Sequence, residues 1–446
     1  MSMTKFWKWG DVMQKISERI KYWGQLLLLS VYGFSFLFPR DKHIWLFGST
    51  FGRRFADNPR YLYLYVSQHS DRSSDQVKAS VERWKAEGHT FIEDEQCKNI
   101  RPIWISHDKA IVEFLNENGY EAYTYHSLKG IWYALRGKIY FFDNYSKDIN
   151  FWQSGGAVKF NMWHGIPLKK IQADNVFDQV RHPKNRWEAF QSFPRRLSDE
   201  KPSHYVLTTS EFMRPIFESA FRTKKVSVTG YPRIDGFAFE DIRNLYTEVE
   251  QRALEKMNNL LNKDKRNKMV YYMPTFRDSE TEFFKVMDLA VFDRFLKENH
   301  LIFCTKLHPK SKLRKQFEAI ESENIINIDA DTDPYVFIHC SSALITDYSS
   351  IYFDYLFADK PIIFFDYDLQ TYLKASREMY FDYKEYTPGV KAKTQKELEQ
   401  ALLSIANGVD ENQEERRQLQ KKLYDITDVC TSRILIEDIC TKELRR

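Results

Sequence analysis

The stretch Ala343-Leu-Ile-Thr-Asp-Tyr-Ser-Ser-Ile-Tyr-Phe-Asp354 decides the fold class, because an apolar run passes through a polar turn into a segment with helical spacing. A buried strand followed at once by a helix is the repeating unit of parallel α/β sheets. The turn predicts a helix N-terminus, where backbone N–H groups, the helix dipole and the hydroxyls of Ser349 and Ser350 can hold a diphosphate above Asp354. The simpler interpretation is that Asp347 or a serine only caps the helix.

The same alternation of short strands and longer helical stretches extends in both directions, and it predicts an α/β protein with parallel sheets. A chain of 446 residues exceeds what one hydrophobic core usually organises, so we expect two domains with a cleft between them. The predicted strands are His43 to Gly48, Arg101 to Ser106, Lys138 to Phe142, Val158 to Trp163, His204 to Thr209 and Lys225 to Thr229, and then Met269 to Met273, Leu301 to Lys306, Ile325 to Ile328, Ala343 to Thr346 and Pro361 to Phe365.

A break in the pattern marks the boundary between the domains. Gly230-Tyr231-Pro232 interrupts it, and a helix rich in Glu, Arg and Leu then runs to about Asn262, before the basic stretch Lys263 to Lys268. We therefore expect a first Rossmann-like domain over residues 41–236 and a second over residues 237–446, which ends in helices.

Charge and cysteine content exclude several classes of protein. The net charge of +4 is small beside 66 basic and 62 acidic residues, so nucleic acid is not an expected partner. The five cysteines are odd in number and lack CxxC spacing, which indicates neither a disulfide framework nor a zinc site. A reducing, cytosol-facing location follows.

Residues 1–40 have the pattern of a membrane-associating segment. Phe6, Trp9, Met13, Ile16 and Ile20 recur at helical spacing with basic residues between them, which is typical of an amphipathic helix on an anionic bilayer surface. The apolar run that follows is shorter than the roughly 20 residues needed to span a bilayer, and it lacks a cleavage site. The alternative is a helix that packs on the protein's own core.

Cationic side chains follow two strands of the predicted second domain. Lys306 and His308 lie together at one strand end, and Arg277 lies just beyond another. Ligands of parallel α/β sheets bind at the carboxyl ends of strands, and arginine can bind phosphate through two hydrogen bonds. These residues are candidate phosphate ligands, although a lone histidine at such a place is often structural.

In the first domain, His164 is the candidate general base. It lies on the turn after a predicted strand, and Gly165 beside it allows close approach of a substrate. A neutral imidazole can accept the proton of an attacking hydroxyl near cellular pH. The alternative is that His164 only hydrogen-bonds a neighbouring backbone group while Trp163 fills the core.

Five motifs, in this order, resemble the CDP-glycerol glycerophosphotransferase family of teichoic-acid primases and polymerases. The first strand and its loop, Leu46 to Arg60, resemble the same family. The motifs are Trp163-His-Gly-Ile-Pro167 with Lys169, Thr229-Gly-Tyr-Pro-Arg-Ile-Asp235, Pro274-Thr-Phe-Arg277, Lys306-Leu-His-Pro309 and Thr346-Asp-Tyr-Ser-Ser350.

The resemblance implies a GT-B architecture, an acceptor held mainly by the first domain and a CDP-activated donor held by the second. The histidine matching His164 would deprotonate an acceptor hydroxyl, which attacks the β-phosphorus of CDP-glycerol while CMP leaves. It implies a second catalytic residue in His308, and no cofactor. The implied donor ligands are Arg277, Lys306, His308, Ser349, Ser350 and Asp354, and the implied acceptor residues are Trp163, Gly165, Lys169 and Arg233.

The resemblance also implies partners: CDP-glycerol or CDP-ribitol as donor, a lipid-linked glycan or polyol-phosphate acceptor, and the anionic cytosolic face of the cell membrane, where the enzyme is peripheral. Priming, chain extension and capsule assembly all stay open. A further basic and aromatic stretch, Arg181 to Arg196, favours a role near a membrane-bound acceptor, with RNA binding as an alternative.

Three competing interpretations remain at this point. The pairs Asp329/Asp331 and Asp366/Asp368 each match DxD, which can hold Mg²⁺ or Mn²⁺ in a glycosyltransferase, whereas we expect no metal. A GT-B enzyme that uses a nucleotide sugar would need the same phosphate contacts. A membrane scaffold without activity would leave the clustering of polar residues at strand ends unexplained.

Overall fold

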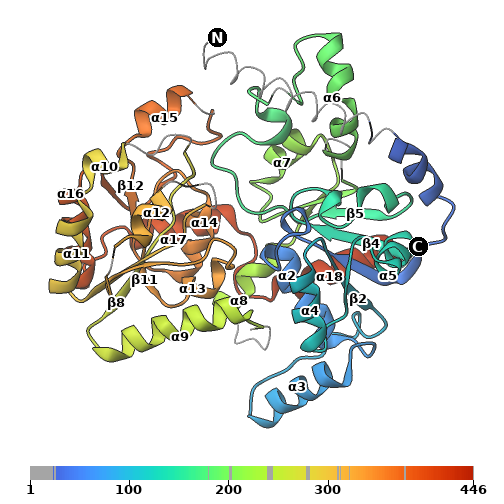
Figure 1. Cartoon of the computed structure of the whole chain (residues 1–446), viewed down its shortest axis with the longest axis horizontal. Helices are drawn as coiled ribbons and strands as arrows, with labels where there is room; N and C mark the ends of the chain where they lie inside the picture. Colours follow the sequence, from blue (N-terminus) through green and yellow to red (C-terminus); the bar gives the residue numbers. More distant parts are fainter. Residues whose placement is uncertain are drawn as a thin grey trace, which may run out of the picture.

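The structure, a computed structural model, describes residue 24 and residues 27–178, 180–199, 203–238, 245–277, 282–308, 311, 313–320, 322–375 and 378–444. Within these residues the chain forms two parallel α/β domains that lie side by side (Figure 1). Most of the expected N-terminal amphipathic helix lies outside the described residues, so that helix stays a prediction. In the described part of the chain, no helix is both long enough and apolar enough to cross a membrane.

The first sheet has seven parallel strands in the order β3-β2-β1-β4-β5-β6-β7. Its strands are almost continuously buried, as expected for a parallel sheet that carries helices on both faces. The strands are β1 (Asp41–Phe47), β2 (Arg101–Ser106), β3 (Ala122–Thr124), β4 (Gly137–Phe142), β5 (Val158–Asn161), β6 (Tyr205–Thr208) and β7 (Val226–Val228).

The second sheet has six parallel strands in the order β10-β9-β8-β11-β12-β13. Val270 of β8 lies opposite both Phe303 of β9 and Ala343 of β11, and the β8–β11 register shifts once, between Ser341 and Ala343. The strands are β8 (Lys268–Tyr272), β9 (Leu301–Thr305), β10 (Ile325–Asn327), β11 (Ser341–Thr346), β12 (Ile362–Phe365) and β13 (Val390–Ala392).

Both sheets reverse their strand order once, between β1 and β4 in the first and between β8 and β11 in the second. In open α/β sheets, ligands bind outside the carboxyl ends of the strands at such a reversal. The topology therefore places one candidate half-site after β1, β4 and β5, and the other after β8, β9 and β11.

Helices connect the strands and cover the sheets. Several begin at side-chain caps: Thr247 accepts from the backbone N–H of Glu250 while Glu250 accepts from that of Thr247, and Thr394 and Glu397 repeat the arrangement. The helices are α2 (Asp57–His69), α3 (Asp75–Ala86), α4 (Lys109–Glu117), α5 (Leu128–Arg136), α6 (Arg186–Asp199), α7 (Arg214–Phe221), α8 (Asp235–Ala238), α9 (Glu248–Lys263), α10 (Phe283–Val286), α11 (Leu289–Glu298), α12 (Leu313–Glu318), α13 (Tyr335–Ile338), α14 (Ile351–Tyr355), α15 (Leu369–Ala375), α16 (Gln395–Ala406), α17 (Gln413–Leu423) and α18 (Thr431–Ile439).

The last helix does not stay with the second sheet. Helix α18 lies beside α2 of the first domain (Figure 1), where Thr431 and Ser432 donate backbone and hydroxyl hydrogen bonds to the buried carboxylate of Asp235. After α18, the hydroxyl of Tyr205 donates to Glu443 at 2.6 Å. The C-terminal segment, which follows the second domain in the chain, thus packs on the first domain. The exact limits of the two domains stay a prediction.

Candidate active site

The two half-sites meet, because the turn after β5 contacts the turn after β11. A Cβ atom built on Gly165 would lie 3.6 Å from the hydroxyl of Ser350 and 3.1 Å from a guanidinium nitrogen of Arg233. Gly165 also has a φ of +139°, which L side chains rarely adopt. Glycine is therefore favoured here by the backbone conformation and by the close approach of Arg233, while Ser350 of the second domain lies at ordinary van der Waals distance.

The turn after β5 is held in an unusual conformation by side-chain hydrogen bonds. Trp163 has a φ of +51° and is buried. The backbone N–H of Trp163 donates to the side-chain amide oxygen of Asn161 at 2.9 Å. The Nδ2 of Asn58 donates to the backbone carbonyl of Trp163, also at 2.9 Å. The indole packs with its centroid 3.9 Å from that of the His164 ring. The turn thus presents His164 outward on a fixed backbone.

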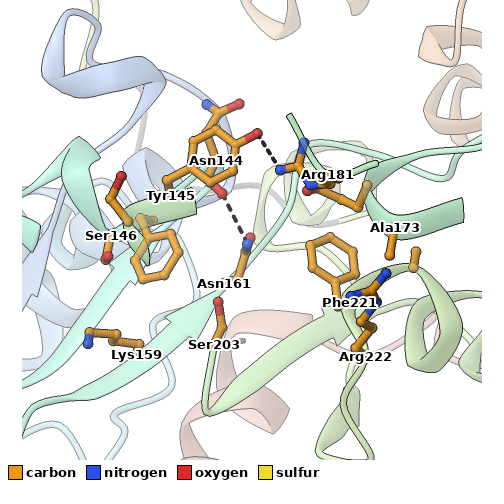
Figure 2. Close-up of a pocket in the computed structure, with 14 residues that line it drawn as sticks. Asn144, Tyr145, Ser146, Lys159, Asn161, Ala173, Arg181, Ser203, Phe221 and Arg222 are labelled. Atoms are coloured by element: carbon orange, nitrogen blue, oxygen red, sulfur yellow. Dashed lines mark hydrogen bonds between the residues drawn. The ribbon is translucent and has the colours of Figure 1, made fainter. Parts of the chain in front are cut away.

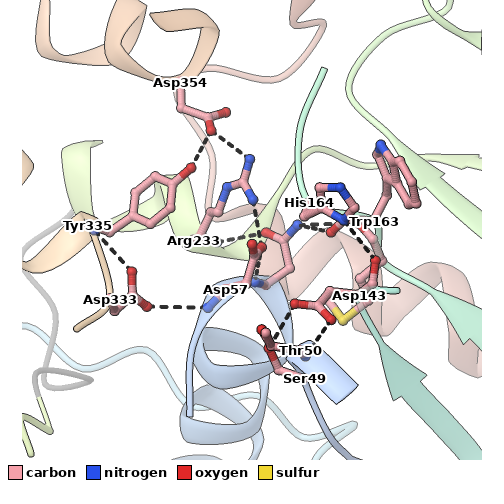
Figure 3. Close-up of polar contacts among 12 residues, drawn as sticks. Ser49, Thr50, Asp57, Asp143, Trp163, His164, Arg233, Asp333, Tyr335 and Asp354 are labelled. Atoms are coloured by element: carbon pink, nitrogen blue, oxygen red, sulfur yellow. Dashed lines mark hydrogen bonds and ion pairs between the residues drawn. The ribbon is translucent and has the colours of Figure 1, made fainter. Parts of the chain in front are cut away.

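His164 has an exposed side chain, and one ring nitrogen has a defined partner. Its Nδ1 lies 3.2 Å from the backbone carbonyl oxygen of Asp143, the residue after β4 (Figure 3). Because a carbonyl only accepts, Nδ1 carries the proton and the lone pair falls on Nε2 in the neutral ring. The Asp143 carboxylate is held in turn by the Ser49 hydroxyl at 2.7 Å and the Thr50 N–H at 2.9 Å. The backbone hydrogen bond weighed above as an alternative is present, and it sets the tautomer that a base requires.

A buried charge network joins the domains behind this turn (Figure 3). Arg233 donates from Nη1 to Asp57 at 2.6 Å and from Nη2 to Asp354 at 2.6 Å. Tyr424 donates to the other oxygen of Asp354 at 2.9 Å, and Tyr335 donates to the same oxygen as Arg233. Burial raises the pKa of the Asp57 carboxyl, while Arg233 and His164 act in the opposite direction. The predicted acceptor residue Arg233 and the predicted donor residue Asp354 are therefore partners of each other.

Lys169, predicted on the acceptor side, reaches the second domain. Its ammonium lies 3.2 Å from the hydroxyl of Tyr372 and over the rings of Tyr348 and Tyr372, whose centroids are 3.8 Å apart. Lys169 also pairs with Met379 in an antiparallel bridge. The segment after His164 is thereby attached to the second domain.

Asp347 organises the turn after β11. It accepts hydrogen bonds from the hydroxyl of Thr275 at 2.7 Å and the N–H of Ser349 at 2.9 Å, and it pairs with Arg277 at 2.8 Å. The side chain of Ser350 makes no cap hydrogen bond at the start of α14. Asp347 holds the turn, and both serine side chains stay partly exposed.

Arg277 is largely buried, and its guanidinium is bound by carboxylates. Besides Asp347, it contacts Asp368 through Nε at 2.5 Å and Nη2 at 2.8 Å. Tyr348 donates to Asp368 as well, at 2.9 Å. Asp368, one of the two aspartates of the second DxD motif, is thus bound to the guanidinium of Arg277. Within the residues that the structure describes, no three His, Cys, Asp or Glu side chains gather in an arrangement that would hold a metal ion.

Lys306 and His308 follow β9, which is the neighbour of β8. The Lys306 ammonium donates to the carbonyl of Ala330 at 3.1 Å; burial lowers its pKa to about 8, and the nearby Arg54 acts in the same direction. His308 is exposed, and its ring centroid lies 4.6 Å from that of Phe276. Because β9, β8 and β11 are adjacent, the predicted donor residues share one sheet edge.

Two aspartates at this site, Asp57 and Asp143, were not predicted from the sequence. Asp57 lies within the stretch Leu46 to Arg60 but was given no role, and Asp143 was not singled out, although it follows a buried strand. The signal available for Asp143 was its place at the end of β4, but the strand order that makes this place special depends on pairings between distant segments.

The chain is similar to known enzymes of teichoic acid synthesis. The profile of the family described as CDP-Glycerol:Poly(glycerophosphate) glycerophosphotransferase matches residues 30–441. The chain is 28% identical over 401 residues to a teichoic acid poly(glycerol phosphate) polymerase of Bacillus spizizenii, covering 85% of this chain and 89% of that protein. It is 27% identical over 409 residues to a teichoic acid glycerol-phosphate transferase of Staphylococcus aureus, covering 90% and 93%.

A solved structure of the wall teichoic acid polymerase TagF aligns with all of this chain and all of that chain, with a TM-score of 0.65 and 20% sequence identity. At this level of identity the likeness establishes the fold, which is the GT-B-like arrangement of two α/β domains expected from the motifs.

Proposed function

Because the chain belongs to the CDP-glycerol:poly(glycerophosphate) glycerophosphotransferase family, we propose that it transfers glycerol phosphate from CDP-glycerol to a hydroxyl of a polyol-phosphate acceptor in teichoic acid synthesis. The product nucleotide is CMP. The observation that carries the assignment of roles is the contact between the two half-sites, where Gly165 beside the base lies against Ser350 of the donor turn.

In the proposed reaction, Nε2 of His164 accepts the proton of an acceptor hydroxyl. The resulting oxygen attacks the β-phosphorus of the donor, so that one P–O bond forms and the bond to the CMP oxygen breaks. The hydrogen bond from Nδ1 of His164 to the Asp143 carbonyl supports this role, because it leaves Nε2 unprotonated in the neutral ring. The nearby Asp57 carboxylate would stabilise the imidazolium that forms.

On the donor side, we assign the phosphate contacts to Lys306, His308, Ser349 and Ser350. Stabilising charge on transferring phosphoryl groups is the main work of such a site, and these side chains lie partly exposed along one sheet edge. The partners of Arg277 and Asp354 support a positioning role for both. Arg277, which follows β8, holds the turns after β11 and β12 through Asp347 and Asp368, and Asp354 holds Arg233.

We further propose that the acceptor is lipid-linked and that the enzyme works at the cytosolic membrane face. Side chains near the start of the described chain support this, since Leu27, Phe34 and Leu37 are 77%, 67% and 72% exposed. Arg40 fixes this segment to the first domain by donating to the carbonyls of Ala134 at 2.6 Å and Gln153 at 2.7 Å. On α6, Trp187 and Phe190 are exposed as well.

The test is incubation of the purified full-length protein with CDP-glycerol, CDP-ribitol and UDP-sugars, each with and without a lipid-linked acceptor. We expect acceptor-dependent release of CMP, with CDP-glycerol as the best donor. CDP-ribitol is included because a teichoic acid poly(ribitol-phosphate) polymerase of Bacillus spizizenii is 31% identical over 199 residues. Faster turnover of CDP-ribitol would change the donor, and turnover of UDP-sugars alone would overturn the reaction class.

A further inference from the structure

The chain that carries the candidate base continues directly onto the second domain. Residues 168–170, four to six positions after His164, pair with residues 378–380 in a short antiparallel ladder. Backbone N–H groups donate across this ladder in both directions, at 2.8 and 2.9 Å. Residues 378–380, which we call the strap, follow α15 of the second domain. The base turn is therefore attached through its own backbone to the domain that carries the predicted donor ligands.

Within this ladder, the side chain of Lys169 reaches the donor turn, which is the turn 347–350 after β11. The Lys169 ammonium lies 5.6 Å from the ring centroid of Tyr348 in that turn and 5.3 Å from the ring centroid of Tyr372 on α15. It also lies 3.2 Å from the Tyr372 hydroxyl. The two tyrosine rings stack, with their centroids 3.8 Å apart. A cation of the first domain thus rests on an aromatic pair that includes a residue of the donor turn.

Among the described residues, the charge of Lys169 is met by aromatic rings and one hydroxyl. The side chain is half-buried, and no Asp or Glu that the structure describes forms an ion pair with it. Aromatic faces attract cations, more strongly where water is partly excluded. Tyr348 is itself fully buried, and its hydroxyl donates to Asp368 at 2.9 Å, so the surface beneath the ammonium is fixed. Lys169, for which the family resemblance implies a contact with the acceptor, is bound instead to side chains of the second domain.

The far end of the same segment is fixed to its own domain. The short helix η4 (Gln172–Asp174) packs on α7, and both elements line one pocket of the first domain (Figure 2). Asp174 accepts hydrogen bonds from the hydroxyls of Ser219 on α7 and Tyr380 in the strap, at 2.6 Å each. The segment from His164 to Asp174 is therefore held between α7 and the strap, so a displacement of the strap is transmitted to the base turn.

We propose that Lys169 is a positioning residue of the reaction, which holds the base turn and the donor turn in register by binding the Tyr348–Tyr372 pair. The proposal rests on the proposed function, in which His164 is the base and the donor turn binds phosphate. It gives Lys169 no contact with either substrate. A displacement of about 1 Å between reacting groups can cost about 100-fold in rate, so a residue that only sets their separation can control turnover.

Steady-state kinetics separate this role from a contact with the acceptor. Lys169→Met keeps an unbranched apolar side chain and removes the charge. We expect kcat to fall by about tenfold or more, while the acceptor KM and the affinity for CDP-glycerol in calorimetric titration each stay within about twofold. Lys169→Arg keeps a cation over the rings and should recover most of kcat. A raised acceptor KM with an unchanged kcat in Lys169→Met would overturn the proposal and make Lys169 an acceptor ligand.

The matched control is Lys170→Met, because Lys170 is the next residue of the ladder and its ammonium pairs with Glu378. The two side chains of this pair are 35% and 56% exposed, so water screens the pair and its loss should change little. We expect kcat of Lys170→Met within about twofold of the wild-type value. Equal losses of kcat in the two Met variants would overturn the proposal, because the contact with the tyrosine pair would then have no specific effect.

Amide hydrogen exchange of the full-length protein measures the coupling without any reaction. Peptides that cover residues 163–171 and 345–350 belong to different domains, and Lys169 contacts both. In Lys169→Met we expect both peptides to exchange severalfold faster than in the wild type, whereas Lys170→Met should leave residues 345–350 unchanged. This result supports the coupling even if CMP release fails and the proposed function with it. Unchanged exchange of residues 345–350 in Lys169→Met would overturn the proposal, whatever the rate of CMP release.

Discussion

Replacing Arg233 by Gln removes the cation that a buried carboxylate, Asp354, and a partly buried one, Asp57, share at the domain interface. The Arg233 side chain is 1% exposed, and it lies 2.6 Å from Asp57 of the first domain and 2.6 Å from Asp354 of the second. Removing one partner of a buried ion pair costs about 3–5 kcal/mol. Tyr335 and Tyr424 still donate to Asp354, so we expect the lower end, about 3 kcal/mol.

The matched control is Arg54→Gln, because Arg54 and Asp331 also form an ion pair between the domains, at 2.9 Å. The two side chains are 22% and 79% exposed, so water screens the pair, and its loss should cost no more than about 1 kcal/mol. The two variants thus remove the same kind of contact at the same interface and differ in burial.

Urea unfolding, followed by tryptophan fluorescence, measures the difference in the free energy of unfolding between the two variants. The first transition is used, because a two-domain chain need not unfold in one step. Burial already raises the pKa of Asp57, and loss of Arg233 raises it further. A raised carboxyl pKa favours the protonated folded form, so the penalty should be largest at pH 7 and shrink as the pH falls towards that pKa. Equal midpoints for the two variants, or a penalty that grows in acid, would refute the reasoning.

Three further predictions concern the donor site and the membrane. The pKa of Lys306 is lowered to about 8, so its ammonium is lost as the pH rises through 8; the KM for CDP-glycerol should rise there, and Lys306→Arg, which stays charged, should flatten the rise. Donor turnover should persist in EDTA, because cationic side chains stabilise the negative charge of the phosphates. Complete loss of turnover in EDTA that Mg²⁺ or Mn²⁺ restores would favour a metal site. Deleting residues 2–26, which spares the buried Tyr32 and the anchored Arg40, should release the enzyme from anionic vesicles, and undiminished pelleting would contradict the membrane assignment.

Strand positions were largely predictable, because buried parallel strands are continuous apolar runs. Each of the eleven predicted strands has a counterpart, most within one or two residues at each end. Two strands, Ala122–Thr124 and Val390–Ala392, were missed, because each contains alanine and lacks the β-branched run that marks the equally short strands Val226–Val228 and Ile325–Asn327. The return of α18 to the first domain was also missed, because its contact with Asp235 joins residues 196 positions apart.

Side-chain roles were predictable only where a local signal existed. A histidine followed by glycine after a strand was enough to propose His164, but not to find the carbonyl of Asp143, which fixes its tautomer. Arg277 was interpreted as a phosphate ligand from its position, and its buried contacts with Asp347 and Asp368 depend on packing between three strand ends. Arg233 and Asp354 were assigned to different substrates because nothing local indicates that they pair across the interface.

The central claim is that a base of the first domain activates an acceptor hydroxyl for attack on a donor held by the second domain. Comparing His164→Ala with His308→Ala tests this claim most directly. Donor affinity is measured by calorimetric titration with CDP-glycerol, and turnover by release of CMP. The account predicts that His164→Ala lowers turnover by about 100-fold or more with donor affinity almost unchanged, because it removes proton acceptance and no donor contact. It predicts that His308→Ala weakens both donor binding and turnover, by about 1.5–3 kcal/mol for a charge-assisted contact. Loss of donor binding in His164→Ala together with intact binding in His308→Ala would contradict the account and reverse the roles of the two domains.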